Sequence, residues 1–447
     1  MNLTLKDIAN KTGGSLVGPD MTVTELVTDS RLVRDNTLFA IIKGERTDGM
    51  NYVRTVGEKY TVAYLTDRPI PDGFGPYLLV DDVIKAVGDI AALHLDTLSA
   101  SHVAVTGSVG KTTTKNFIAS ALSACMSVHF SEGNKNNELG MPLTALGTTK
   151  DHDAVILEMG MRGMGQITYL CNIAKPDVAV ITNVGVSHIE ILGTRENILR
   201  AKCEIIDALS EGGTAVINAD DDMLSTVKTD KKTLRFGIEN ENCDLRAVNI
   251  VDNKFDLLYK EKTYPVKLAT LGIHNVYNAL AAIAVGTALG CDVKKLITGV
   301  ESFKGDGSRQ NIYDFEGVRI FDDTYNASPA SMNASMDVMQ GFDGRKVVVL
   351  ADMLELGDYS ESAHAELSEP VKKLDAAVCI CIGKYMKHLK NALDGRDGVY
   401  HCENNAQALE ILKSTVKTGD NVLFKGSNSM NLSDLLNKFK GEWKNGN

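Results

Sequence analysis

Short apolar runs recur between residues 100 and 220, and they constrain the fold more than any other feature of this chain. The runs are HVAVTG, DAVILEMG, DVAVITN and GTAVINA, and segments with helical periodicity separate them. Strands that are apolar on both faces and alternate with helices form parallel sheets covered on both sides. The sequence therefore predicts an α/β fold with a central parallel sheet.

Two further regions flank this central one. After residue 309 a second series of apolar runs, VRIFDD, KVVVLAD, AAVCICIG and NVLFKG, predicts a doubly wound, Rossmann-like domain. Before residue 83, short runs such as TLFAIIKG and PYLLVDD alternate with turns, which is typical of a small α/β unit. Since 447 residues exceed what one hydrophobic core usually holds, we predict three domains at 1–82, 83–308 and 309–447.

Composition excludes several classes of protein. A net charge of −11 argues against a protein that coats nucleic acid or an anionic membrane. The apolar stretch ALAAIAVGTALG at 279–290 is too short to span a bilayer, and the start, MNLTLKDIANKTGG, lacks the apolar core of a signal peptide. The eight cysteines form no Cys-x-x-Cys pair and are predicted to be small buried residues. We expect a cytoplasmic protein that is not integral to a membrane.

The segment HVAVTGSVGKTTTKNFIASAL at 102–122 has the order strand, glycine turn, helix. Backbone amides of such a turn, the helix N-terminus and a lysine can hold a triphosphate, while a threonine hydroxyl can reach Mg²⁺. The pattern Gly-x-x-Gly-Lys-Thr is two residues tighter than the general phosphate loop, and the alternative is a glycine-rich turn with a solvated lysine. The segment predicts ATP and Mg²⁺ binding through Gly107, Ser108, Val109, Gly110, Lys111, Thr112 and Thr113.

An acidic residue and a histidine follow two of the predicted strands. Glu158 comes directly after AVIL, and His188 lies five residues beyond ITN. Ligands of open α/β sheets bind beyond the carboxyl ends of the strands, so both side chains are expected near the phosphate loop. With Thr112 they form a candidate O/N ligand set for Mg²⁺. Taken singly, Glu158 is equally a turn cap and His188 a loop histidine.

A lysine interrupts the apolar face of the predicted helix NILRAKCEIIDAL at 197–209. Lys202 falls close to the centre of the arc formed by Ile198, Leu199, Ile205, Ile206 and Leu209. A buried ammonium near metal is costly, so such a lysine must be neutral, paired or chemically converted. The alternative is that only the aliphatic part of the Lys202 side chain is buried and its ammonium reaches solvent at the edge of the apolar face.

These motifs together resemble the Mur ligases, ATP-dependent amide ligases of peptidoglycan precursor synthesis. The resemblance covers nearly the whole chain, and it implies an N-terminal domain that holds UDP, a central ATPase and a C-terminal Rossmann-like lid. The matching segments are TDSRLVRDNTLFAIIKGERTDG, TGSVGKTTTK, NKNNELGMPLT, LEMGMRGMGQI, TNVGVSHIEILG, ENILRAKCEII, GIHNVYNALAAIAV, DDTYNASPASM and LADMLELG.

The resemblance also implies roles for individual residues. The catalytic set would be Lys111, His188, Lys202 and Arg309, with Lys202 carbamylated to N6-carboxylysine, which exchanges a positive for a negative charge. The remaining nucleotide contacts would be Asn275, Asn278 and Asp323, the muramoyl-peptide contacts Asn136 and Asn137, and the UDP contacts Ser30, Arg31, Asp48 and Gly49.

Each of these roles has a simpler alternative. Asn275 is a candidate helix cap, Arg309 a solvated loop cation and Asp323 a turn acceptor. Ordinary turn chemistry accounts for the four residues assigned to UDP nearly as well as ligand contact does.

Within the family the resemblance is to the member that joins D-alanyl-D-alanine to UDP-N-acetylmuramoyl-tripeptide through an acyl phosphate, with ATP and Mg²⁺, and a monomer is expected. Alternatives are the ligase that adds the third residue, a folylpolyglutamate synthetase, against which the UDP segment argues, and a nucleotide-gated binding protein without ligase activity. The chain departs from the family pattern at Asn36, where glycine is common, at Met50 and Tyr52, which replace His and Phe, and at Asn428, which replaces Arg.

Overall fold

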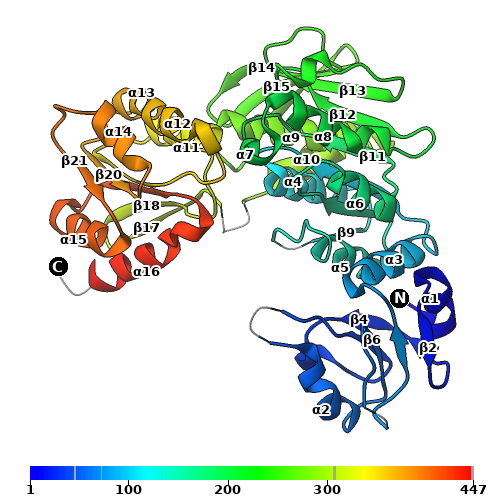
Figure 1. Ribbon diagram of the computed structural model, residues 1–447. Coiled ribbons are helices and arrows are strands. Elements are labelled where there is room, and N and C mark those ends of the chain that lie inside the picture. The colour runs from blue at the N-terminus through cyan, green and yellow to red at the C-terminus, as the bar shows by residue number, and fades with distance from the viewer. Residues whose placement is uncertain (45–46, 72, 132, 306–308, 444–447) are drawn as a thin grey trace.

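Three α/β domains follow one another along the chain in the computed structural model, which describes residues 1–44, 47–71, 73–131, 133–305 and 309–443. Figure 1 shows the three bodies, with the central domain in contact with each of the other two. Each large sheet takes its strands from one of the three predicted ranges, and the predicted α/β class is confirmed. The boundaries between the ranges stay a prediction, and residue 308 lies outside the described residues.

The N-terminal domain is built on a five-stranded sheet with the order β2-β7-β6-β5-β4, next to the strand pair β1-β3. Asn36, which precedes β5, adopts φ of 62°, a left-handed conformation that asparagine tolerates better than most residues with a Cβ. The asparagine therefore preserves the backbone that glycine provides elsewhere in the family pattern. The elements are β1 (Leu3–Thr4), α1 (Leu5–Thr12), β2 (Ser15–Val17), β3 (Thr22–Val23), β4 (Glu25–Val27), η1 (Ser30–Leu32), β5 (Thr37–Ala40), η2 (Gly49–Tyr52), α2 (Val53–Gly57), β6 (Val62–Thr66) and β7 (Tyr77–Leu79).

The central domain holds a nine-stranded sheet with the order β16-β15-β14-β13-β12-β11-β8-β10-β9. The strands from β9 to β14 in this order pair in parallel, as predicted, while β14, β15 and β16 form an antiparallel extension that the sequence analysis did not predict. Its strands are β8 (Ser101–Thr106), β9 (Val128–Phe130), β10 (Ala154–Glu158), β11 (Val178–Ile181), β12 (Thr214–Asn218), β13 (Lys232–Gly237), β14 (Leu245–Val251), β15 (Lys254–Tyr259) and β16 (Lys262–Lys267).

Helices cover both faces of the central sheet. One apolar core lies under α3, α5, α6 and α8, and a second lies under α4, α9 and α10. The apolar stretch at 279–290 falls largely within α9, where Leu280 and Ile283 are fully buried in the second core. The helices are α3 (Val83–Leu95), α4 (Lys111–Ser123), α5 (Gly140–Leu146), α6 (Gln166–Ala174), α7 (Ile189–Leu192), α8 (Arg195–Asp207), η3 (Leu224–Thr226), α9 (Ile273–Ala288) and α10 (Val293–Ser302).

The C-terminal domain has a six-stranded sheet with the order β17-β18-β22-β19-β20-β21, parallel except for β17, which confirms the predicted Rossmann-like domain. Its elements are β17 (Asn311–Phe315), β18 (Val318–Asp323), α11 (Pro329–Gln340), β19 (Lys346–Ala351), η4 (Gly357–Tyr359), α12 (Ser360–Glu366), α13 (Ser368–Lys373), β20 (Val378–Ile382), α14 (Met386–Ala392), β21 (Val399–Cys402), α15 (Asn405–Thr415), β22 (Asn421–Lys425), η5 (Asn428–Met430) and α16 (Leu432–Trp443).

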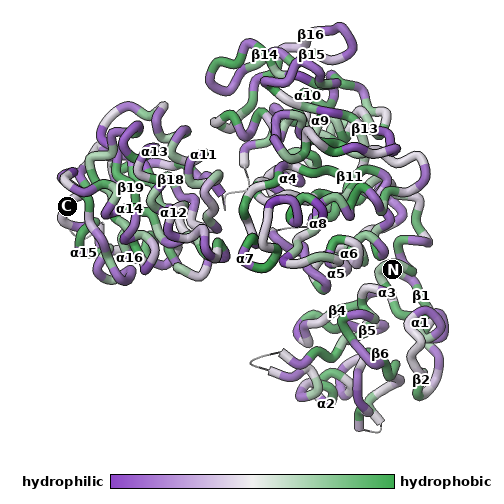
Figure 2. The backbone as a smooth tube through the Cα atoms, turned by 45° about the horizontal axis from the view of Figure 1, so that its top comes forward, coloured by the Kyte–Doolittle hydropathy of each residue, from purple (hydrophilic) through white to green (hydrophobic). Residues whose placement is uncertain are grey.

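Hydropathy follows this layering. Figure 2 shows hydrophobic residues along sheet strands such as β11, whereas hydrophilic residues are frequent in the outer loops. No helix formed by the described residues is both long and apolar enough to cross a lipid bilayer. All eight cysteines are free thiols, but the prediction that they are buried holds only for Cys171, Cys379, Cys381 and Cys402, since the other four are partly exposed.

The central and C-terminal domains touch where α7 meets η4 (Figure 1). A Cβ added to Gly357 would lie 3.2 Å from the Cα of Glu190, so the two backbones approach closely here. This contact places the carboxyl ends of the two parallel sheets on either side of one cleft.

Candidate active site

A large cleft, with a volume of about 1510 Å³, runs between the central and C-terminal domains. It collects loops that lie at the carboxyl ends of strands of both sheets, which is where open α/β sheets bind ligands. Its lining includes residues 108–114, 134–140, 182–183, 187–188, 274–275, 277–278, 309–312, 325–328, 354–356 and 427–429.

The phosphate loop between β8 and α4 depends on two glycines. Gly107 has φ of 155°, and a Cβ at this position would lie 1.9 Å from Oγ1 of Thr182. Gly110 has φ of 83° and caps α4. Residues with a Cβ rarely adopt these conformations, so the tight turn requires glycine at both positions.

Hydrogen bonds from β11 and the loop after it hold the phosphate loop in place. The backbone N–H of Val109 donates to Oδ1 of Asn183 at 2.9 Å, and the Thr182 hydroxyl donates to the carbonyl of Val109 at 2.7 Å. The N–H of Gly185 donates to the Ser108 hydroxyl at 2.9 Å. The turn is therefore preorganised by protein contacts.

Lys111 begins α4 and points back over the turn. Its ammonium donates to the carbonyl of Gly107 at 2.8 Å. Burial lowers the pKa of Lys111, Glu158 opposes that shift, and the charge of Arg309 adds to it. A phosphate would give this ammonium the negative partner that its surroundings only partly supply.

Glu158, the last residue of β10, joins the phosphate loop to a second loop. Its side chain is 1 % exposed, and its Oε2 accepts a 2.8 Å hydrogen bond from the hydroxyl of Thr112. Its Oε1 accepts a 2.7 Å bond from the Asn136 side-chain amide. A threonine hydroxyl beside a buried carboxylate is an oxygen-rich pair of the kind that Mg²⁺ prefers.

His188 lies at the start of α7 with φ of 63°. Its Nδ1 is 2.9 Å from Oε2 of Glu355 in the C-terminal domain, a close contact without hydrogen-bond alignment. Burial lowers the pKa of His188, Glu355 opposes the shift, and Lys111 and Lys202 reinforce it. These charges place His188 near the phosphate loop, and a neutral imidazole is the form that binds metal.

Lys202 is 1 % exposed within α8, so its stem does not carry the ammonium to the surface. Burial and the nearby charge of Lys111 hold the pKa of Lys202 well below its ordinary value. The apolar arc that the sequence indicated is present, with Ile198, Ile205 and Ile206 buried. The described residues contain no group of three or more His, Cys, Asp or Glu side chains arranged for a metal, so any ion here depends on other donors.

Asn275 and Asn278 line the cleft from the first turns of α9. Oδ1 of Asn278 accepts a 2.8 Å bond from the Thr114 hydroxyl, and the Asn278 amide donates to Oδ1 of Asn275 at 3.1 Å. The Asn275 amide donates to the carbonyl of Leu271 at 2.7 Å. The bond between Thr114 and Asn278 ties α9 to α4, the helix that follows the phosphate loop.

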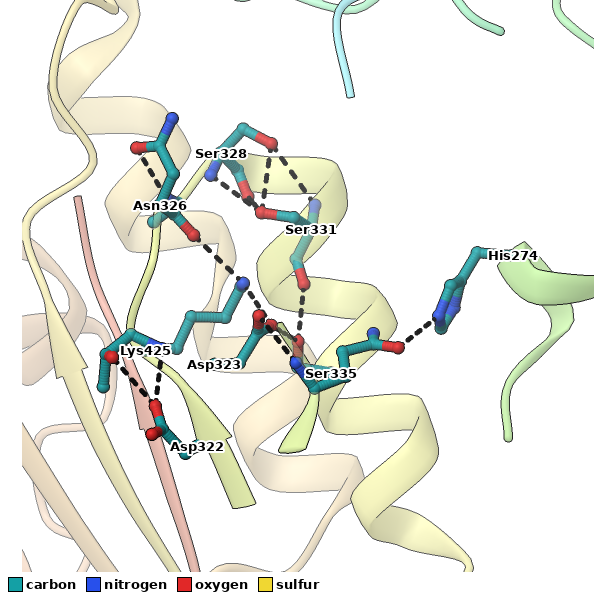
Figure 3. A network of polar contacts seen from close by, with 11 residues as sticks. His274, Asp322, Asp323, Asn326, Ser328, Ser331, Ser335 and Lys425 are labelled. Atoms are coloured by element: carbon teal, nitrogen blue, oxygen red, sulfur yellow. Dashed lines mark hydrogen bonds and ion pairs between the residues drawn. The ribbon is translucent and has the colours of Figure 1, made fainter. Parts of the chain in front are cut away.

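On the other wall of the cleft, Asp323 ends β18 and forms a buried ion pair with Lys425 at the end of β22 (Figure 3). The Ser335 hydroxyl donates to Oδ2 of Asp323 at 2.6 Å. Burial acts to raise the pKa of Asp323, but Lys425 and Ser335 outweigh it and the pKa is lowered. Figure 3 also shows His274 of the central domain reaching the C-terminal domain, with its Nε2 2.7 Å from Oε1 of Gln310.

Arg309 lies in the same cleft, one residue before Gln310, with its guanidinium carbon 4.1 Å from the centre of the Tyr325 ring. Arginine is well suited to phosphate recognition because its planar fork offers paired donors. Asn428, the departure from the family pattern, also lines the cleft and is exposed there.

The four residues assigned to UDP are in the N-terminal domain and are not among those that line the cleft. The Arg31 guanidinium pairs with Asp29 at 2.5 Å, and Asp48 caps η2 by accepting from the N–H of Met50 at 3.0 Å. Asp48 also accepts from Arg68 at 2.6 Å. Ser30 lies within η1 and Gly49 within η2, and the assignment of the four residues to UDP stays a prediction.

Several side chains in the cleft or next to it were not predicted from the sequence. Lys425 and Asn183 each follow or end an apolar run that the analysis did identify, so their positions could have been examined. Glu355 lies in the matched segment LADMLELG, but its contact with His188 depends on the packing of two domains. Lys115 on α4 is fully buried, although lysine side chains are mostly exposed. Its spacing of four from Lys111 places both on one side of the helix.

A glycine phosphate loop beside a buried carboxylate, facing a Rossmann-like domain across a cleft, defines a nucleoside triphosphate-dependent enzyme site. The sequence matches two family models, the Mur ligase middle domain over residues 105–286 and the Mur ligase, glutamate ligase domain over residues 308–428. The UDP-N-acetylmuramoyl-tripeptide–D-alanyl-D-alanine ligase of Bacillus subtilis is 35 % identical, covering 97 % of each chain. That of Escherichia coli is 31 % identical, covering 98 % of each chain.

Solved structures give the same result. MurF from Acinetobacter baumannii has a TM-score of 0.90 at 30 % identity and covers 99 % of both chains. The MurF ligase from Thermotoga maritima, determined in complex with ADP, has a TM-score of 0.83 at 31 % identity and covers 94 % of this chain and 98 % of its own. The chain belongs to the Mur ligase family, and within it to the MurF ligases.

Proposed function

We propose that this protein uses ATP and Mg²⁺ to join D-alanyl-D-alanine to the tripeptide carboxylate of UDP-N-acetylmuramoyl-tripeptide. The observation that carries the proposal is the double role of Glu158, which contacts Thr112 of the phosphate loop and Asn136 of the loop assigned to the muramoyl peptide. The relatives that cover the whole chain carry the name of this activity.

A carboxylate is a poor electrophile, so amide formation in water requires activation. In the proposed reaction the substrate carboxylate attacks the γ-phosphate of ATP to give an acyl phosphate and ADP, and the dipeptide amine then displaces phosphate. Lys111 and Arg309 stabilise negative charge on the transferring group. The C-terminal domain closes over the cleft and excludes the water that would hydrolyse the acyl phosphate.

Thr112, Glu158 and His188 are the residues proposed to hold Mg²⁺. When bound, the ion would neutralise charge on the phosphates. The fit rests on the hydroxyl–carboxylate pair at 2.8 Å and on a histidine whose pKa is lowered by burial. Carbamylated Lys202 would add two oxygens in the same region, and the lowered pKa of its amine favours the neutral form that reacts with CO₂.

The UDP group is assigned to the N-terminal domain, at Ser30, Arg31, Asp48 and Gly49. We place the reaction in the cytoplasm, where ATP and UDP-linked precursors occur and where thiols stay reduced, as all eight are in this chain. A monomer suffices for the proposed reaction, because one chain carries all of the residues assigned to it.

Phosphate release measured with ATP, Mg²⁺ and UDP-N-acetylmuramoyl-tripeptide, with and without D-alanyl-D-alanine, tests the proposal. Tripeptides that end in lysine and in diaminopimelate are both assayed, and the ligated product is identified by mass. We expect release to depend on the dipeptide. Release that depends on a free third amino acid and a dipeptide substrate instead would indicate the neighbouring ligase, and ATP binding without turnover would indicate a binding protein.

A further inference from the structure

Lys115 is a fully buried lysine in the central domain, on the helix that follows the phosphate loop. Its ammonium donates to the carbonyl of Ser131 at 2.5 Å and to the carbonyl of Gly133 at 2.9 Å. The same nitrogen is 3.9 Å from Oε2 of Glu158, which is also buried. The lysine thus reaches from α4 to the loop after β9 and to the end of β10.

Burying an ammonium is costly unless carbonyl oxygens and a carboxylate surround it. An apolar side chain of similar length would fill the same core space without that cost. The polar contacts of Lys115 therefore account for a lysine at this position better than core packing does, and these contacts lead directly into the cleft.

The loop held by Lys115 leads within three residues to Asn136. The Asn136 amide donates to Oε1 of Glu158 at 2.7 Å, and its carbonyl accepts from the N–H of Gly160 at 2.8 Å. A Cβ at Gly160 would lie 2.9 Å from Oδ1 of Asn136, so there is no room for the loop to move inward. Residues 133–136 are thus fixed by Lys115 at one end and by Glu158 and Gly160 at the other.

We propose that Lys115 is a positioning residue for the acyl substrate, holding residues 133–137 so that Asn136 and Asn137 face the peptide of UDP-N-acetylmuramoyl-tripeptide. Lys115 acts through these asparagines and touches no substrate itself. The proposal rests on the proposed function, because it assigns the loop to that substrate.

The test compares steady-state kinetics of the parent protein and Lys115→Met, with Lys295→Met on the exposed face of α10 as the control. Losing a charged donor to the carbonyls of Ser131 and Gly133 is expected to raise the KM for UDP-N-acetylmuramoyl-tripeptide about tenfold or more. We expect the KM for ATP to change by less than about threefold, since the bonds that hold the phosphate loop come from other residues. A purely structural role would lower the thermal midpoint without this difference between the two substrates.

A double-mutant cycle with Asn136→Ala sharpens the test. If Lys115 acts through Asn136, the KM of the double variant rises by much less than the product of the two single changes. Should Lys115→Met fail to fold, Lys115→Gln, which keeps amide donors without charge, replaces it in the same cycle. Equal changes in both KM values, no change in either, or strictly multiplicative effects would overturn the role of Lys115. An inactive parent protein would instead overturn the proposed function, and the role of Lys115 with it.

Discussion

The hydroxyl of Thr112 donates a hydrogen bond to Oε2 of Glu158 across 2.8 Å. The parallel register of the sheet produces this contact: Glu158 pairs with Val105 on β8, and that strand leads straight into the phosphate loop. Glu158, the last residue of β10, therefore lies beside the first turn of α4, the helix that follows the neighbouring strand β8.

Replacing Glu158 by glutamine should separate charge from shape at this site. Glutamine keeps an oxygen for the Thr112 hydroxyl but removes the negative charge available to Mg²⁺. We expect kcat to fall by about 100-fold or more, in line with the loss of one important electrostatic contact in a catalytic site. ADP binding without Mg²⁺, measured by calorimetry, should change little.

Glu241→Gln is the matched control, because Glu241 pairs with Arg246 on the surface of the same domain. Its turnover should equal that of the parent protein. Full activity of Glu158→Gln at low Mg²⁺ concentration would remove Glu158 from the predicted metal site.

Gly107→Ala should disable the phosphate loop through sterics. The added methyl group would meet Oγ1 of Thr182 at 1.9 Å in a conformation that residues with a Cβ avoid. Gly212→Ala provides the comparison, because Gly212 has φ of 76° with no atom within 4 Å of the added Cβ. The control isolates the conformational cost, about 1–2 kcal/mol in the free energy of unfolding.

We expect Gly107→Ala to lower the free energy of unfolding by more than Gly212→Ala does. It should also weaken ADP binding at least about tenfold, since the turn must move to relieve the contact. Urea unfolding and calorimetry measure the two effects. Equal destabilisation of the two variants, with normal ADP affinity in both, would show that the loop tolerates a side chain at this position.

Stability should fall in mild acid partly because of His364. Its Nε2 accepts from the N–H of Met353 at 2.9 Å, and its Nδ1 contacts the carbonyl of Ser360 at 2.5 Å. The Nε2 bond requires the neutral ring, whereas Nδ1 donates to Ser360 in either protonation state. Burial lowers the pKa of His364 from its ordinary value of 6.5, against the opposing effects of Ser360 and Asp352. Above pH 6.5 neither the folded nor the unfolded state is protonated here, so this contribution is complete.

As the pH falls below 6.5, the unfolded state binds a proton first, and stability drops by up to about 1.4 kcal/mol per pH unit until the folded pKa is reached. Denaturant unfolding of the parent protein and of His364→Gln between pH 7.5 and 5.5 measures this loss. The variant should be less stable at pH 7.5 but should lose less stability with acid. Identical slopes would show that His364 titrates alike in both states.

Much of the architecture could be predicted because apolar runs such as DAVILEMG are typical of parallel strands, which are buried on both faces of the sheet. The antiparallel strands β14 to β16 were missed because they lie in a polar region and alternate buried with less buried residues, as buried Phe255 and partly exposed Asp256 do. Their pairing depends on neighbours that local sequence does not reveal.

The same limit applies to the site. Glu158 and Thr112 were predicted because each follows a strand or a glycine turn, where ligands of α/β sheets gather. Glu355 and His188 belong to different domains and lie more than 160 residues apart in the chain. Only tertiary packing brings Oε2 of Glu355 to 2.9 Å from Nδ1 of His188. Lys202 was predicted only in part. Helical periodicity indicated that its side chain points inward, and its burial confirms this. Its modification stays a prediction.

Carbamylation of Lys202 is the last prediction. A neutral amine reacts with CO₂ to form a carbamate and release one proton, and the lowered pKa of Lys202 favours the neutral amine. With ¹³C-labelled bicarbonate, we expect a carbamate carbon signal in the NMR spectrum of the parent protein. It should be absent from Lys202→Arg, which keeps a positive charge but cannot form the adduct.

Activity should follow the same pattern. Lys202→Ala is expected to lose most turnover, and the parent protein should weaken in bicarbonate-free buffer and recover when bicarbonate is restored. Lys231→Ala, at a partly exposed lysine of the same domain, controls for the loss of an amine. A parent protein that is indifferent to bicarbonate, together with an active Lys202→Ala, would show that Lys202 is a buried lysine without a carbamate.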